Sequence, residues 1–268
     1  MLKLRNKNDN TQTQLLDLIN DKFNQVIIDI EGTGDKQKGE KHFPFDIAIY
    51  VVNAFGKIIF KKSLVVEEIF EDEIAMNSAF FKNKIPFYNE KLDVLCKDKD
   101  AILYQLIKIP KVLKAINDII KTNNVKVISA YNVSYDYDGI NNLYELRPHI
   151  TNKFKRLNDL DIQKLFIKFL MDFPKAKKYF FKWCKENNKT TPTGCASTTA
   201  ETVYQYITKN INFKEHHTGL RDLEIEFAIY KWILRKYKKA KKQLIYPLNT
   251  RGTFGVALYQ GKTPFLAI

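Results

Sequence analysis

Short apolar runs rich in β-branched residues, separated by glycines and polar turns, dominate the first half of the chain. Residues 25–30 (QVIIDI) form one such run, and two glycines follow it closely, which predicts a buried strand. Residues 45–53 and 57–66 predict two more strands, and the link 53–56 is typical of a hairpin turn. Residues 126–130 (KVISA) predict a further buried strand.

Helical spacing of apolar residues predominates in the rest of the chain. Residues 67–122 are expected to be mainly helical, a helix is expected to start at Asp136, and a last helix is expected over about 222–242. Residues 150–213 carry several helical patterns, and Thr198-Thr-Ala-Glu201 resembles a capping box before one of them. The order of these elements predicts an α/β fold, a mixed sheet with helices packed on it.

The same patterns suggest how the chain is divided. Residues 1–24 are polar apart from a short amphipathic stretch and predict an N-terminal arm or helix. Residues 25–243 predict one α/β domain, with a helix-rich insertion at about 150–213. The tail, 244–268, is rich in glycine and proline and is expected to be irregular.

Charge adds a class of partner to this picture. The 268 residues include 44 Lys and Arg against 30 Asp and Glu, a formal net charge of +14, and 45% are hydrophobic. There is thus enough apolar material for a core, and the basic surplus favours a polyanionic partner, most commonly nucleic acid. A Lys-rich composition with a solvated surface explains the charge equally well.

Cysteine usage and hydropathy bear on the compartment. The three cysteines show no C-x-x-C spacing, which favours reduced thiols in a cytoplasmic protein. No apolar run reaches the roughly 18 residues of a membrane-spanning helix, and the N-terminus lacks the apolar core of a secretory signal. We therefore expect a cytoplasmic protein with no membrane partner, in the host cytoplasm if a phage encodes it.

Two acids occupy the first predicted strand. Asp29 and Glu31 are two residues apart, so both side chains would project from one face of the strand. Two carboxylates this close repel, and a divalent cation removes that penalty. The alternative is a strand end at which Asp29 meets a lysine and Glu31 is solvated.

A third acid follows the strand at 126–130. Asp136 would lie just beyond the carboxyl end of that strand, where open α/β sheets place their ligands, and Asn132 could fix the loop by an Asx-type turn. The alternative is that Asp136 simply caps the next helix, and Asp138 competes for the same role.

A histidine and a fourth acid open the last predicted helix. His217 precedes Asp222 by five residues, so a loop-to-helix junction can bring both to one site. An imidazole suits proton abstraction from water at neutral pH. The alternative is a surface histidine beside a helix-capping acid, and the neighbouring His216 adds a second candidate.

Taken in order, these segments resemble the motifs of a known family. D-I-E-G-T-G at 29–34, N-V-S-Y-D at 132–136 and H-T-G-L-R-D at 217–222 are similar to the three motifs of the DEDDh (DnaQ-like) 3′–5′ exonuclease superfamily. The resemblance spans roughly 26–240, with identity confined to these short segments. It implies a ribonuclease H-like mixed sheet flanked by helices, with a helical insertion and an irregular C-terminal extension.

The resemblance also implies roles for single residues. Asp29, Glu31, Asp136 and Asp222 match the four metal-binding acids, and His217 matches the general base. The spacing within the second motif selects Asp136 over Asp138. The spacing within the third motif selects His217 over His216.

Substrate contacts and departures from the family pattern complete the comparison. Thr33, Asn132 and Tyr135 are expected to contact the substrate, and Thr33 matches a family residue beside the terminal nucleotide. Gly32 replaces the usual Thr and Gly219 the usual Ala, and neither position supplies a metal ligand.

The implied cofactors are two divalent cations, Mg²⁺ or Mn²⁺. The charge of four carboxylates and their oxygen-only ligands agree with that choice. Two such ions would clamp the attacking and leaving oxygens of an in-line displacement, giving nucleoside 5′-monophosphates.

The expected function is therefore metal-dependent 3′–5′ exonuclease activity on nucleic acid, with single-stranded DNA favoured. The motifs do not distinguish this from an RNA-trimming exoribonuclease or a polymerase-associated proofreading exonuclease. A catalytically silent nucleic-acid-binding module is the alternative of another class. Replication or recombination proteins are candidate partners, and the sequence leaves the oligomeric state open.

Overall fold

The computed structural model describes residues 24–34, 40–53, 56–79, 81–94 and 103–241. The expected N-terminal arm (apart from Asn24) and the C-terminal tail at 244–268 lie outside the described residues, so both stay predictions. The proposed division into domains stays a prediction as well.

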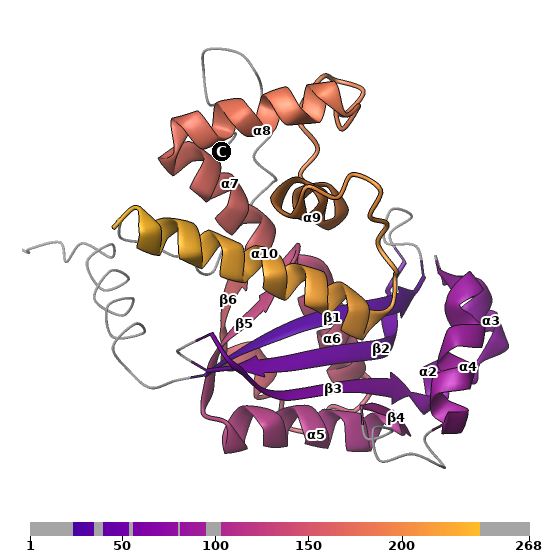
Figure 1. Ribbon diagram of the computed structural model, residues 1–268. Helices are drawn as coiled ribbons and strands as arrows, with labels where there is room; N and C mark the ends of the chain where they lie inside the picture. Colours follow the sequence, from indigo (N-terminus) through magenta and orange to yellow (C-terminus); the bar gives the residue numbers. More distant parts are fainter. Residues whose placement is uncertain (1–23, 35–39, 54–55, 80, 95–102, 242–268) are drawn as a thin grey trace, which may run out of the picture.

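A six-stranded mixed sheet forms the centre of the described part of the chain (Figure 1). Its strand order is β4-β3-β2-β1-β5-β6. The central strand β1 is antiparallel to β2 and parallel to β5. β3 is antiparallel to β2, while β4 and β6 extend the two edges in parallel. The strands are β1 (Asn24–Thr33), β2 (Phe43–Val52), β3 (Ile58–Val66), β4 (Tyr104–Ile107), β5 (Val125–Ala130) and β6 (Asn158–Asp161).

Helices cover both faces of the sheet. Helices α5 and α6 lie on one face, while α10 crosses the other and α7, α8 and α9 build outward from it (Figure 1). Three short helices, α2, α3 and α4, pack beside one end of β3 (Figure 1). The helices are α2 (Glu67–Phe70), α3 (Glu73–Asn77), α4 (Ile85–Val94), α5 (Ile109–Thr122), α6 (Val133–Glu145), α7 (Ile162–Asp172), α8 (Pro174–Glu186), α9 (Ala200–Thr208) and α10 (Gly219–Lys239), with single 3₁₀ turns at η2 (Lys82–Lys84) and η4 (Phe154–Arg156).

Alternation along β1 divides the core into two layers. Val26, Ile28 and Ile30 belong to the hydrophobic cluster under α5 and α6. Ile27 belongs to the cluster that α7, α8, α9 and α10 complete. Because side chains alternate along a strand, Asp29 and Glu31 share the face of Ile27, beneath α10. The strand pattern itself thus directs both acids toward the last helix.

The expected hairpin turn between β2 and β3 is confirmed. The Gly56 N–H donates to the Asn53 carbonyl at 2.9 Å, and the Lys57 N–H donates to Asn53 Oδ1 at 3.0 Å. Gly56 has a φ of +73°, a conformation that glycine adopts without a steric penalty.

Two strands and several element ends differ from the sequence-based prediction. β4 lies within the segment expected to be mainly helical, and β6 lies within the helix-rich insertion. Both are four-residue edge strands, too short to show an alternating pattern, and parallel pairing with an inner strand creates them.

The first residues of three helices also differ from the prediction. α6 begins at Val133 and α10 at Gly219, each three residues before the expected start. The cap of α9 is Thr199, whose hydroxyl accepts the Thr202 N–H at 3.3 Å, so the capping box predicted at 198–201 is wrong: the cap lies one residue later and its third helical residue is a threonine, not a glutamate.

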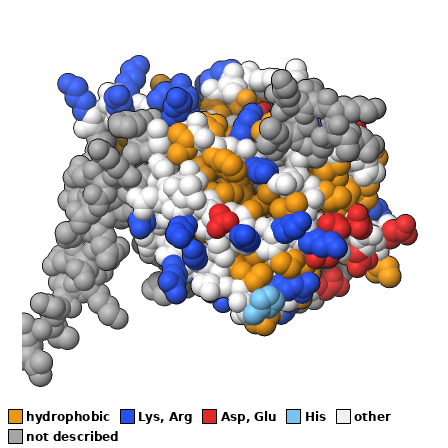
Figure 2. Space-filling view, turned by 90° about the horizontal axis from the view of Figure 1, so that it is seen from below, with side chains coloured by type: hydrophobic (Ala, Val, Ile, Leu, Met, Phe, Trp, Pro, Cys, Tyr) orange, Lys and Arg blue, Asp and Glu red, His pale blue; other side chains and the backbone are white. Residues whose placement is uncertain are grey.

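No helix in the described segments is long and apolar enough to cross a bilayer. Viewed from below the sheet, the surface carries Lys and Arg spread among apolar side chains, and acidic side chains gather at the edge formed by α2 and α3 (Figure 2). That edge includes Glu71, Asp72 and Glu73, all exposed. The basic surplus on this face is therefore dispersed rather than concentrated in one stripe.

The packing of α6 on β1 yields a stability prediction. A Cβ on Gly139 would lie 2.4 Å from Ile30 Cδ1 and 3.0 Å from His42 Nε2. Alanine normally stabilises a helix relative to glycine by about 1 kcal/mol. Here we expect Gly139→Ala to lower the free energy of unfolding by about 1–3 kcal/mol, because the core is overpacked. Urea unfolding measures the difference.

The matched control removes the colliding methyl group. Ile30→Val deletes Cδ1, so the double variant should lose less stability than the two single losses added together. A Gly139→Ala variant at least as stable as the parent would contradict this account of the contact.

Candidate active site

Strand β1 and helix α10 bring three carboxylates together. Ligand oxygens of Asp29, Glu31 and Asp222 all lie within 4.8 Å of one another. The first two project from one face of β1, as the spacing predicted, and Asp222 comes from the first turn of the helix that crosses this face. Glu31 and Asp222 are 6% and 5% exposed and Asp29 is half-buried, so the group is largely beneath the surface.

Asp136 reaches the same region from the opposite layer. It lies in the first turn of α6, is 3% exposed, and its Oδ1 accepts the Ile30 N–H at 3.0 Å. This bond fixes the acid to the backbone between the two acids of β1. The negative charge of Asp136 raises the pKa of Asp29, which shows that the two groups interact electrostatically.

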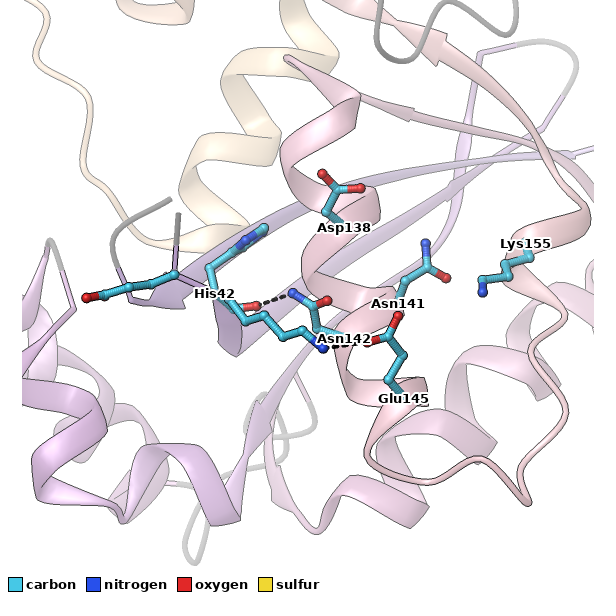
Figure 3. A pocket seen from close by; sticks show the side chains of 8 residues that line it. His42, Asp138, Asn141, Asn142, Glu145 and Lys155 are labelled. Carbon is cyan, nitrogen blue, oxygen red and sulfur yellow. Dashed lines mark hydrogen bonds and ion pairs between the residues drawn. The ribbon is translucent and has the colours of Figure 1, made fainter. Parts of the chain in front are cut away.

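Asp138, the rival of Asp136, lies elsewhere. It is exposed and lines a surface pocket of about 530 Å³ beside α6. Figure 3 shows it on the side of α6 that carries Asn142 and Glu145, with His42 across the pocket. The Glu145 carboxylate binds Lys41 Nζ at 2.9 Å at this pocket. The structure thus separates the two acids onto different sides of one helix.

Burial and mutual repulsion dominate the electrostatics of the carboxylates. Burial first, then neighbouring carboxylates, raises the pKa of both Asp29 and Glu31 well above the ordinary values. Burial and then the charge of Glu215 raise the pKa of Asp222 to about 8, although the backbone N–H groups of His217 and His216 hydrogen-bond its carboxylate. Without a cation, burial and mutual repulsion therefore both favour the protonated form of these carboxyls.

The carboxylate group fits divalent cations. Asp29 Oδ2 and Asp222 Oδ1 are buried atoms without a hydrogen-bond partner among the described residues. Such atoms are costly unless a ligand satisfies them. Because all the donors are carboxylate oxygens, the hard cations Mg²⁺ and Mn²⁺ match them better than Zn²⁺.

His217 occupies a different position from the three carboxylates. Its imidazole stacks on Phe81, with ring centroids 3.8 Å apart and planes 9° from parallel. Its backbone is left-handed, with a φ of +54°, which is unusual for a residue other than glycine. Burial, then the charge of Lys84, lowers the pKa of the imidazole. His216 instead lies beside Phe87, with ring centroids 5.8 Å apart.

The three expected substrate residues differ in accessibility. Thr33 is 4% exposed, and its hydroxyl donates to the Phe43 carbonyl at 3.2 Å. Asn132 is exposed, in a left-handed conformation at the N-cap of α6, and its side chain makes no capping bond. Tyr135 is half-buried and stacks on His42, with ring centroids 4.3 Å apart. The latter two thus present side-chain groups toward solvent, whereas the Thr33 hydroxyl is already engaged.

Gly32 has a local reason for lacking a side chain. A Cβ at this position would lie 3.0 Å from the Tyr135 hydroxyl and 3.5 Å from the Phe43 carbonyl oxygen. The tyrosine therefore occupies the space that a threonine at position 32 would need.

Two further acids belong to the site but were missed from sequence. Glu226 is 3% exposed, its Oε2 has no described partner, and its charge is the largest neighbouring contribution that raises the pKa of Asp29. Burial raises the pKa of Glu215 to about 7, and its charge acts on Asp222. Glu226 follows Asp222 by one helical turn, among the apolar residues of α10, and that pattern could have revealed it.

Comparison with known proteins supports the fold. No protein-family model matches the chain, and no curated protein matches it in sequence. Among solved structures, a 3′-exonuclease described for 3′-end specific recognition of histone mRNA stem-loop is 15% identical, with a TM-score of 0.50 over 80% of this chain and 83% of that one. Exonuclease I is 11% identical, with a TM-score of 0.51 over 80% of this chain and 41% of its own.

A third structure, E. coli exonuclease I with a 5cy-dT13 oligonucleotide, is 10% identical, with a TM-score of 0.51 over 82% of this chain and 42% of its own. The chain thus has the fold of 3′-exonucleases, and the predicted ribonuclease H-like α/β class is confirmed. It spans less than half the length of exonuclease I.

The raised pKa values predict how stability depends on pH in the absence of metal. A carboxyl with a raised pKa stabilises the folded state fully below its unfolded pKa, and the contribution is lost as pH rises through the folded value. For Asp222 this window runs from the ordinary 3.8 to about 8. In EDTA, the melting temperature should therefore fall between pH 5 and 8.5, and saturating Mg²⁺ or Mn²⁺ should reduce the fall.

Two variants isolate the contribution of the site. Asp222→Asn should flatten the dependence of the melting temperature on pH in EDTA. Asp138→Asn, at an exposed position, should leave that dependence as in the parent. The melting temperature of the parent could instead rise between pH 5 and 8.5, with no such rise in Asp222→Asn. That result would contradict a raised pKa of the Asp222 carboxyl.

Proposed function

We propose that this chain is a metal-dependent 3′–5′ exonuclease that hydrolyses nucleic acid, with single-stranded DNA favoured, to nucleoside 5′-monophosphates. The observation that carries the proposal is the convergence of the Asp29, Glu31 and Asp222 oxygens within 4.8 Å on a fold shared with 3′-exonucleases. The buried, unpartnered oxygens of this group support a cation site rather than a network of structural hydrogen bonds.

The four motif acids would hold two divalent cations, Mg²⁺ or Mn²⁺. Bound cations would polarise the scissile phosphate and stabilise charge on the attacking and leaving oxygens. The protein's part is to fix its carboxylates before the substrate arrives. Asp29 and Glu31 are fixed by strand pairing, Asp136 by its bond to the Ile30 N–H, and Asp222 by the N–H groups before α10.

His217 would act as the general base in this mechanism. A base must be unprotonated, and the lowered pKa of the imidazole favours the neutral form at neutral pH. The imidazole would turn away from Phe81 to accept a proton from the attacking water. This movement would occur at the junction of loop and helix, because His217 has a left-handed backbone and directly precedes the cap of α10.

The substrate would meet polar and aromatic groups beside the carboxylates. Tyr135 and Asn132 are accessible for contacts with the terminal nucleotide, and Thr33 would contribute main-chain contacts. The net charge of +14 favours a polyanion in general. Among the neighbours, one recognises an mRNA stem-loop and another binds a dT13 oligonucleotide, so both RNA and DNA belong in the assay.

The decisive experiment follows the ends of labelled strands. With 5′-labelled single-stranded DNA and Mg²⁺ or Mn²⁺, we expect stepwise shortening from the 3′ end, abolished by EDTA. Asp29→Ala should reduce the rate by roughly 1000-fold or more, because it removes a cation ligand. His217→Ala should reduce it by about 100-fold or more, the usual contribution of a general base. Duplex DNA and RNA run in parallel would rank the substrates.

The same substitution at two acids of α6, Asp136 and Asp138, provides the control for the activity assay. Asp136→Asn should lose activity, whereas Asp138→Asn, two residues along the helix and exposed, should retain it. Strand binding without cleavage under any metal condition would instead identify a catalytically silent binding module. Full activity of His217→Ala would remove the base assignment alone.

A further inference from the structure

Asp46 is a fully buried carboxylate outside the three motifs. It lies in β2, is 0% exposed, and is paired in register with Glu31 of β1. By strand alternation it shares the face of Ala48, which belongs to the cluster beneath α10. Asp46 thus lies next to the carboxylates of the proposed metal site without being one of the residues that the motifs specify.

Side chains from two other elements donate to this carboxylate. Ser63 Oγ of β3 donates to Oδ1 at 2.6 Å, and the Tyr88 hydroxyl of α4 donates to Oδ2 at 2.7 Å. The backbone of Gly219, the first residue of α10, lies against the same carboxylate, since a Cβ there would be 2.8 Å from Oδ2. Asp46 therefore joins β2, β3, α4 and the first residue of α10 at a single point.

Burial raises the pKa of Asp46 to about 6, even though the hydrogen bonds from Ser63 and Tyr88 lower it. Ionising the side chain in this position thus remains unfavourable despite its partners. A buried carboxylate that is costly to ionise is not expected to add much to the stability of the fold. The contacts of Asp46 indicate a different role.

The contact with α10 leaves no room for a side chain at Gly219. A Cβ there would lie 2.8 Å from Asp46 Oδ2 and 2.7 Å from Ala48 Cβ. Helix α10 therefore begins in direct contact with β2, and its first residue lies beside a carboxylate, the charge that a helix N-terminus favours. The glycine at 219, where the family pattern has alanine, is the consequence of this contact.

We propose that Asp46 is a positioning residue that fixes the start of α10, so that Asp222 meets the two acids of β1. Gly219 lies two residues after His217 and three before Asp222, about one helical turn. A displacement of this junction would move the His217 loop and the Asp222 carboxylate together relative to Glu31. The inference rests on the proposed function, because it takes these carboxylates to be the cation ligands.

Cation binding, measured without substrate, tests the inference. We expect Asp46→Ala to weaken Mn²⁺ binding in calorimetry by about tenfold or more, the equivalent of losing one hydrogen bond to a charged group. Asp46→Asn, which keeps the size of the side chain packed against Gly219, should lose less. Ser63→Ala removes a donor to the same carboxylate away from α10 and should leave Mn²⁺ affinity within about twofold.

Gly219→Ala supplies an independent route to the same displacement. Its added Cβ should weaken Mn²⁺ binding to a similar degree, and the double variant Asp46→Ala/Gly219→Ala should lose less than the product of the two single effects. Full additivity would show that the two residues act separately and would overturn the proposal. So would a lower melting temperature with unchanged Mn²⁺ affinity in Asp46→Ala, since Asp46 would then only stabilise the fold.

The parent protein separates this inference from the proposed function. If the parent binds Mn²⁺ and shortens strands but the Asp46 variants bind Mn²⁺ normally, only the positioning role fails. If the parent neither binds Mn²⁺ nor cleaves, both fail. If Asp46→Ala does not fold, the Gly219→Ala result decides, and an unchanged affinity there overturns the proposal.

Discussion

Crowding of like charges beneath the surface is the constraint on which the site depends. Asp29, Glu31 and Asp222 place oxygens within 4.8 Å of one another, and Asp136 and Glu226 add further negative charge to the same region. Each neighbour raises the pKa of Asp29, so the arrangement opposes ionisation of its own members. A rigid scaffold and a cation are the two means by which a protein can hold such a group, and the fold supplies the first.

The two core layers supply that rigidity. Even-numbered residues of β1, such as Ile28, pack under α5 and α6, and Ile27 packs under α10, so the strand is held from both faces. The acids extend the Ile27 face to the carboxyl end of β1, where α10 begins. Tyr50 of β2 donates its hydroxyl to the Leu220 carbonyl at 3.4 Å, which ties the first turn of α10 to the sheet. The carboxylates thus belong to elements that are held together by packing and hydrogen bonds.

Local patterns predicted the parts of this site that depend on sequence spacing. The positions of Asp29 and Glu31 follow from alternation in one strand, and the motif order placed the later acids on the correct elements. Spacing could not reveal the stack of His217 on Phe81, because it joins residues 136 positions apart. The edge strands β4 and β6 were missed for a related reason. Four residues show no clear period, and only their pairing with inner strands defines them.

The two departures from the family pattern have a common physical explanation. At Gly32 the atom nearest to an added Cβ would be the Tyr135 hydroxyl, at 3.0 Å, and at Gly219 the nearest atoms would be Ala48 Cβ, at 2.7 Å, and Asp46 Oδ2, at 2.8 Å. In each case a side chain from a neighbouring element packs closely against the glycine backbone. A site decaying through loss of function would be expected to lose ligands while retaining unrelated packing. Here Asp29, Glu31, Asp136 and Asp222 keep the residue types of the motifs, and neighbouring side chains pack closely on each glycine, which favours changed packing around the proposed site over its decay.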